Sequence, residues 1–87
     1  MFRLWGKIIK DNRLIKDTVI INDHDHTRTH KILEALESIC FQFDLSKPIW
    51  LEVNISEFKA RGKTRFYSDS FIESIDFDYL EIQIIEE

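Results

Sequence analysis

The stretch from Thr27 to Phe43 constrains the fold most, because its pattern predicts one long helix. Apolar side chains recur there at the spacing of a single helical face: Ile32, Leu33, Leu36, Ile39, Cys40 and Phe43. Asp25 or Thr27 can cap this helix by accepting a hydrogen bond from a free backbone N–H. An apolar stripe of this length must be removed from water, so the rest of the chain has to supply a surface that covers it.

The segments on either side of the helix alternate between apolar and polar residues, and this period of two predicts strands. The alternating stretches are 2–9, 14–21, 49–55, 64–67 and 77–85. A short helical turn is expected over 55–61, with Asn54 and Glu57 as a capping box and Gly62 at its left-handed end. Together these elements predict one α+β domain, residues 1–87, in which a single sheet carries the long helix on one face.

The first two strands are joined by Asp11-Asn12, a pair that tolerates the positive φ of a two-residue turn. Closing the hairpin there places Leu4 opposite Val19 on the inner face of the sheet. The same register places Gly6 opposite Asp17 on that face. A bulge near Gly6, or an early end to regular pairing, would relieve this conflict.

The element order resembles the ubiquitin-like β-grasp, in which the first and last strands pair in parallel at the centre of the sheet. This resemblance implies a mixed sheet in ββαββ order with one long helix packed on it. An antiparallel α+β meander with one helix is the alternative. Leu45-Ser46-Lys47-Pro48-Ile49-Trp50 and the segment 71–82 are also similar to a small uncharacterised bacterial protein family of the Firmicutes type. That second resemblance implies no activity.

Charge and composition narrow the class of protein. The net charge of −4 disfavours general nucleic-acid binding. Basic residues gather in 1–16 and acidic residues in 68–87, which predicts that the first and last strands lie side by side. No apolar run reaches the roughly 18 residues of a transmembrane helix, and no signal peptide is recognisable. We therefore expect a cytoplasmic protein that binds no membrane and needs no cofactor.

One cluster of metal-ligand residue types precedes the predicted helix. It consists of His24, His26 and His30, with Asp23 beside them. Imidazoles four residues apart on a helix can reach one ion, and a carboxylate can complete a tetrahedral set for zinc. The alternative is a solvated region at the helix start, where polar and acidic residues are common.

A run of positive charges interleaved with aromatic residues lies later in the chain: Lys59, Arg61, Lys63 and Arg65. Such a run can bind a phosphate backbone or single-stranded nucleic acid. The alternative, which the negative net charge favours, is a solvated segment that pairs with the acidic C-terminal part of the chain.

The outer face of the sheet, opposite the long helix, is the strongest functional clue. It is predicted to carry an apolar and aromatic patch: Trp5, Ile9, Leu14, Ile20, Trp50 and Tyr79. Such a patch exceeds what a monomer usually exposes and has the composition of a protein contact surface. It can bind a protein partner, close a homodimer, or be covered by the segment 54–67. No catalysis is expected, because Cys40 lies on the core stripe, away from the histidines. The sequence therefore predicts a non-enzymatic interaction or self-association domain.

Overall fold

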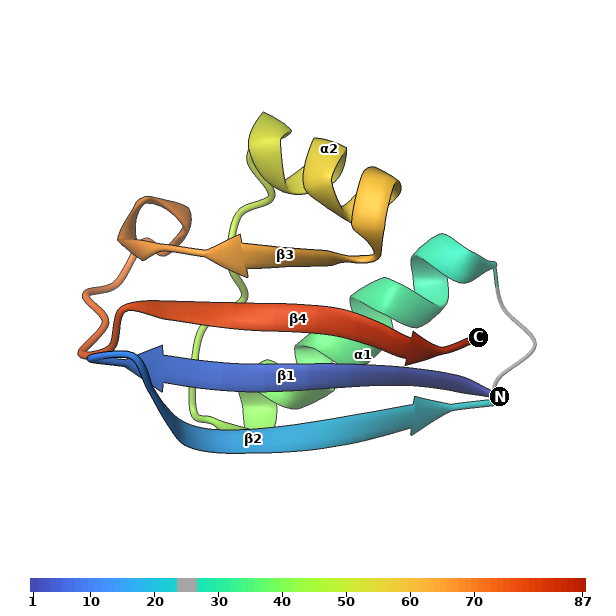
Figure 1. Cartoon of the computed structure of the whole chain (residues 1–87), viewed down its shortest axis with the longest axis horizontal. Coiled ribbons are helices and arrows are strands. Elements are labelled where there is room, and N and C mark those ends of the chain that lie inside the picture. The colour runs from blue at the N-terminus through green and yellow to red at the C-terminus, as the bar shows by residue number, and fades with distance from the viewer. Residues whose placement is uncertain (24–26) are drawn as a thin grey trace.

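The computed structural model describes residues 1–23 and 27–87, in which two helices and four strands form one α+β unit (Figure 1). The strands are β1 (Phe2–Lys10), β2 (Arg13–Asn22), β3 (Lys63–Phe66) and β4 (Tyr79–Glu86). The helices are α1 (Arg28–Gln42) and α2 (Glu52–Arg61), and a 3-10 turn, η1, covers Ser68–Ser70. The sheet has the strand order β2-β1-β4-β3, and each neighbouring pair is antiparallel. No helix in these residues is long and apolar enough to cross a bilayer.

The α+β class and the single sheet are confirmed, but two finer predictions are wrong. The central strands β1 and β4 are antiparallel, so the sheet is not the mixed sheet that the β-grasp resemblance implies. The element order is ββααββ rather than ββαββ, because a second full helix lies between α1 and β3. The antiparallel sheet agrees with the alternative arrangement, although that alternative contained one helix.

The long helix is confirmed almost residue for residue. Thr27 is its N-cap, and the Thr27 hydroxyl oxygen accepts a hydrogen bond from the backbone N–H of His30 at 3.3 Å. Five residues of the predicted stripe are buried, Ile32, Leu36, Ile39, Cys40 and Phe43, together with Ala35, which was not predicted. Leu33 departs from the prediction, because its side chain is exposed.

The core lies between α1 and the inner face of β1 and β4. Leu4, Leu80 and Ile82 are fully buried there. Gly6 sets the distance between helix and sheet, because a Cβ added to it would lie 2.7 Å from Cγ2 of Ile39. The missing side chain therefore lets α1 approach β1 closely.

The first hairpin has the predicted turn but a different register. Asp11 and Asn12 both have positive φ, of 52° and 63°, as a two-residue turn requires. Beyond Leu14, however, Ile15 is an extra residue in β2, and the pairing resumes with Lys16 opposite Ile8. The predicted pairs are therefore wrong from this point onward, because each later residue is shifted by one position.

The predicted strand over 49–55 is also wrong. Residues 49–51 have no regular structure, and α2 begins at Glu52. The buried side chains of this segment, Asn54 and Phe58, lie four residues apart, which is helical spacing. Val53 and Ile55, which created the alternation, are exposed.

The predicted cap of this second helix is shifted as well. Leu51 is the N-cap, and its backbone N–H donates to Oδ1 of Asn54 at 3.0 Å. Asn54 is therefore the third helical residue and not the cap. Gly62 ends the helix as predicted, in the left-handed conformation with φ of 70°.

Candidate functional site

The outer face of the sheet is open in the described part of the chain. α1 packs behind β1 and β2 (Figure 1), and the buried Asn54 of α2 donates a hydrogen bond to Oγ1 of Thr64 at 2.9 Å. Thr64 is paired with Ile82, a core residue of the inner face, so α2 covers the same face as α1. Residues 54–67 thus form most of α2 and the edge strand β3, instead of folding over the outer face.

The middle of the outer face carries an ion-paired cluster of Lys7, Glu81 and Arg65. Glu81 lies between the two cations, with its Oε2 2.6 Å from Nζ of Lys7 and its Oε1 2.8 Å from Nε of Arg65. Burial alone would raise the pKa of Glu81, but the hydrogen bonds from Lys7 and Arg65 outweigh it and the pKa is lowered. The pKa of Arg65 is raised, chiefly by its hydrogen bond to Glu81. Pairing of the basic β1 with the acidic β4 is confirmed.

Aromatic rings flank this cluster on both sides. Nζ of Lys7 lies 3.9 Å from the centre of the Trp5 ring, and the guanidinium carbon of Arg65 lies 4.6 Å from the centre of the Tyr79 ring. Nε1 of Trp5 donates to Oδ2 of Asp17 at 2.9 Å and so holds the indole in place. The centre of the outer face therefore satisfies its own charges and polar groups.

The edge strand β2 differs from this centre. Apolar side chains are exposed along it: Leu14 by 51%, Ile15 by 54%, Val19 by 43% and Ile21 by 54%. Leu14, Val19 and Ile21 lie on the outer face, because they are paired with Ile9, Trp5 and Arg3. We refer to Leu14, Ile15, Val19 and Ile21 together as the β2 edge.

Of the six residues predicted for the outer patch, four lie on the outer face and two do not. Trp5, Ile9, Leu14 and Tyr79 lie on the outer face as expected. Ile20 does not, because the bulge turns it to the inner face opposite Leu4. Trp50 does not either, because its ring packs edge-on against Phe58 and Phe66 at 5.5 and 5.1 Å on the inner side.

Val19 and Ile21 were missed by the sequence pattern, and they replace Ile20 on the outer face. A signal for the change existed in the sequence, namely the conflict between Gly6 and Asp17. The bulge removes this conflict, because Gly6 is opposite Thr18 and Asp17 is opposite Lys7 on the outer face.

Part of the predicted metal cluster, His24 and His26, lies outside the described residues. Asp23 is exposed, and Nδ1 of His30 lies 3.1 Å from the Thr27 hydroxyl beside the helix cap. Residues 1–23 and 27–87 contain no group of three side chains that could hold a metal ion. The histidine site therefore stays a prediction.

The predicted basic run is divided between two surfaces: Arg61, Lys63 and Arg65 line one polar pocket beside Glu57 and Glu81, whereas Lys59 lies outside that pocket. Lys59 and Arg61 lie on α2, whereas Lys63 and Arg65 lie on β3. Lys59 lines a groove between the two helices, while Arg65 is held by Glu81 on the outer face. This ion pair agrees with the alternative in which the run pairs with the acidic C-terminal segment.

Cys40 is buried, as predicted from its place on the helix stripe. Burial raises the pKa of its thiol to about 11, since the apolar surroundings disfavour the thiolate. The thiol is therefore protonated at neutral pH and is a poor nucleophile.

Comparisons with known proteins identify no relative. No family model, no curated protein and no solved structure matches the chain. The resemblances to the β-grasp and to a small bacterial family thus have no match to support them. The structure shows a small α+β fold with one antiparallel sheet.

Proposed function

We propose that the protein is a non-enzymatic association domain that pairs with another protein strand along β2, and that this strand belongs to a second copy of the chain. The observation that carries the proposal is the length and exposure of β2, a ten-residue strand at the edge of the sheet. Seven of its ten side chains are exposed, and four of these seven are apolar.

Strand pairing explains both properties of this edge. An edge strand presents backbone N–H and C=O groups that a docking strand can satisfy with ladder hydrogen bonds. Docking there also removes Val19 and Ile21 from water on the outer face, beside Trp5. The ion-paired centre of the face gains little from such cover, because its charges already have partners.

A second copy is the occupant that β2 fits by symmetry. Two identical strands that pair antiparallel are related by a two-fold axis, which is the commonest symmetry of homo-oligomers. A register centred on Val19 places the two Val19 side chains opposite each other, and Asp17 of each copy opposite Ile21 of the other. No like charges oppose each other in this register, whereas a register centred on Lys16 or Asp17 would place two lysines or two aspartates opposite each other.

Sedimentation equilibrium over a range of concentrations tests the proposal, with Val19→Lys as the disrupting variant. We expect a monomer–dimer equilibrium for the wild type and a dissociation constant about 100-fold higher for Val19→Lys, because two lysines would then face each other. The partial exposure of Val19 lets the folded monomer accommodate the change. An association that Val19→Lys leaves unaltered would place the interface elsewhere.

Cross-linking of Val19→Cys tests the register itself. Opposite residues of an antiparallel pair have Cα atoms roughly 4.5–5.5 Å apart, within the range of a disulfide. We expect mild oxidation to give a covalent dimer, and the matched Lys63→Cys variant on β3 to remain monomeric. Cys40 does not compete, because it is buried. A wild type that stays monomeric at every concentration contradicts the proposal.

A further inference from the structure

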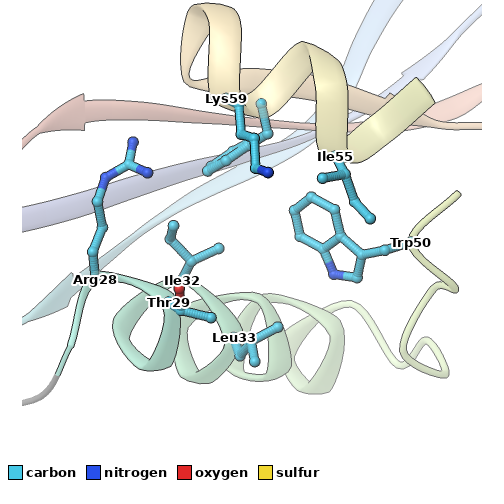
Figure 2. A pocket seen from close by; sticks show the side chains of 8 residues that line it. Arg28, Thr29, Ile32, Leu33, Trp50, Ile55 and Lys59 are labelled. Carbon is cyan, nitrogen blue, oxygen red and sulfur yellow. The ribbon is translucent and has the colours of Figure 1, made fainter. Parts of the chain in front are cut away.

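A groove of about 320 Å³ lies between α1 and α2 on the inner side of the molecule (Figure 2). Its apolar lining comes from both helices and the segment between them: Ile32, Leu33, Trp50, Ile55 and Phe58. Leu33 and Ile55 are 45% and 43% exposed and point toward the groove from opposite walls. Leu33 departs from the predicted helix stripe and Ile55 from the predicted strand, and both of these exposed side chains line the same groove.

Two cations lie at the rim of this groove. Arg28 projects from the start of α1 and Lys59 from α2, so each wall supplies one positive charge (Figure 2). Arg28 already binds a carboxylate, because its Nε lies 2.5 Å from Oε1 of Glu87. Both side chains of this ion pair are about half exposed, so the pair can exchange in water.

We propose that the groove binds a small apolar molecule that carries one carboxylate, such as a medium-chain fatty acid. The apolar part would lie against Trp50 and between Leu33 and Ile55, and the carboxylate would lie between Arg28 and Lys59. The volume is at the lower end of the range for small-molecule sites, which fits a ligand of modest length. An apolar lining with few charged groups at one end is the usual composition of such sites.

NMR titration with decanoate, below its micelle concentration, tests this proposal within a single spectrum. The indole N–H of Trp50 reports on the groove, and that of Trp5 reports on the opposite face of the sheet. We expect a saturable shift of the Trp50 signal with the Trp5 signal unchanged. Equal shifts of both signals, or no shift, would overturn the proposal, because the probe would then bind non-specifically or not at all.

Three variants and one uncharged probe separate the apolar and ionic parts of the site. Ile55→Glu places a carboxylate at the groove and should weaken decanoate binding by at least about tenfold, because like charges repel and apolar contact is lost. Phe41→Glu, a matched change on an exposed side chain elsewhere on α1, should leave binding unchanged. Lys59→Gln should weaken binding of decanoate about fivefold and leave binding of 1-decanol unchanged.

The remaining outcomes count against the proposal. If 1-decanol binds as tightly as decanoate, the cations have no role and the carboxylate is wrongly assigned. If Ile55→Glu dissociates a dimer in sedimentation while Val19→Lys does not, the groove is occupied by a second copy rather than by a ligand. The readouts for the groove and for the β2 edge are thus independent of each other.

Discussion

The sheet ends in a long exposed strand on one side and in a short covered strand on the other. β2 spans ten residues and exposes apolar side chains along its length. β3 spans four residues and packs against α2, whose buried Asn54 donates to the backbone carbonyl of Arg65 at 2.9 Å. Short or covered edges are the usual protection of a sheet against pairing with other chains.

The contrast shows that the two edges are protected to different degrees within the described residues: β3 is short and covered by α2, whereas β2 has only local protection near its start. The bulge at Ile15 and the inward-facing Lys16, whose Nζ lies 5.3 Å from the centre of the Phe43 ring, both discourage pairing with another strand. Beyond them, the regular stretch from Asp17 to Asn22 exposes Val19 and Ile21 and is open to another strand. A strand left in this state is suited to association, which is why we base the proposed function on it.

Removing the cover from β3 should have the largest effect on the folded state. Asn54→Ala deletes three hydrogen bonds of a fully buried side chain, including the one from Leu51 and the one to Thr64. We expect a loss of about 2–4 kcal/mol in the free energy of unfolding, because buried polar partners are left unpaired.

Chemical denaturation measures this loss, and hydrogen exchange locates it in the amides of β3. Ser56→Ala, an exposed change on the same helix, is the matched control and should shift the free energy of unfolding by less than about 0.5 kcal/mol. If Asn54→Ala behaves like Ser56→Ala, α2 does not hold the β3 edge.

A smaller effect is expected where Glu81 joins β3 to the centre of the sheet. Glu81→Gln should cost about 1–2 kcal/mol at pH 7, because Lys7 is largely buried and loses its charged partner. The pKa of Glu81 is lowered in the folded state, so its contribution is complete above the ordinary carboxyl pKa of about 4.3 and is lost as the pH falls through the lower folded value.

Unfolding curves of both proteins at pH 7 and below pH 4 measure this dependence. The difference between wild type and Glu81→Gln should shrink at the lower pH, where the wild-type carboxylate begins to be protonated. A difference that stays constant with pH would mean that the ion pairs contribute little and that the change acts through packing.

The smallest effect is expected for a charge reversal on the β3 edge. Lys63→Glu should leave the free energy of unfolding within about 0.5 kcal/mol and leave the oligomeric state unchanged. Sedimentation beside Val19→Lys makes the comparison direct, since each variant alters one edge. If Lys63→Glu dissociates the dimer, the interface includes β3 and our assignment of it to β2 is wrong.

Much of the fold could be predicted because its local signals agree with its packing. The helix stripe, the cap at Thr27, the turn at Asp11-Asn12 and the left-handed Gly62 all follow from short-range chemistry. The segment 49–55 was misassigned because an alternation of exposed side chains imitates a strand, whereas its two buried residues are too few to reveal a helix.

The candidate site was harder to predict, because it depends on registers and on contacts between distant elements. Because Ile15 is unpaired, Val19 lies on the outer face and Ile20 on the inner face, the reverse of the prediction. A strictly alternating pattern cannot predict such a shift. The groove depends on the packing of α1 beside α2, and the exposure of Leu33 and Ile55 is explained only once both helices are in place.

The bulge at Ile15 also gives the chain an uneven tolerance to changes of length. Ile15 has no partner in β1, because Leu14 is opposite Ile9 and Lys16 is opposite Ile8. Deleting Ile15 would remove the bulge and leave Leu14 opposite Ile9 and Lys16 opposite Ile8, so the seven residues after it would keep their faces. The chain should therefore tolerate the loss of this one residue, whereas deleting the paired residue Asp17 would bring Ile15 into the pairing and set Lys16 opposite Lys7.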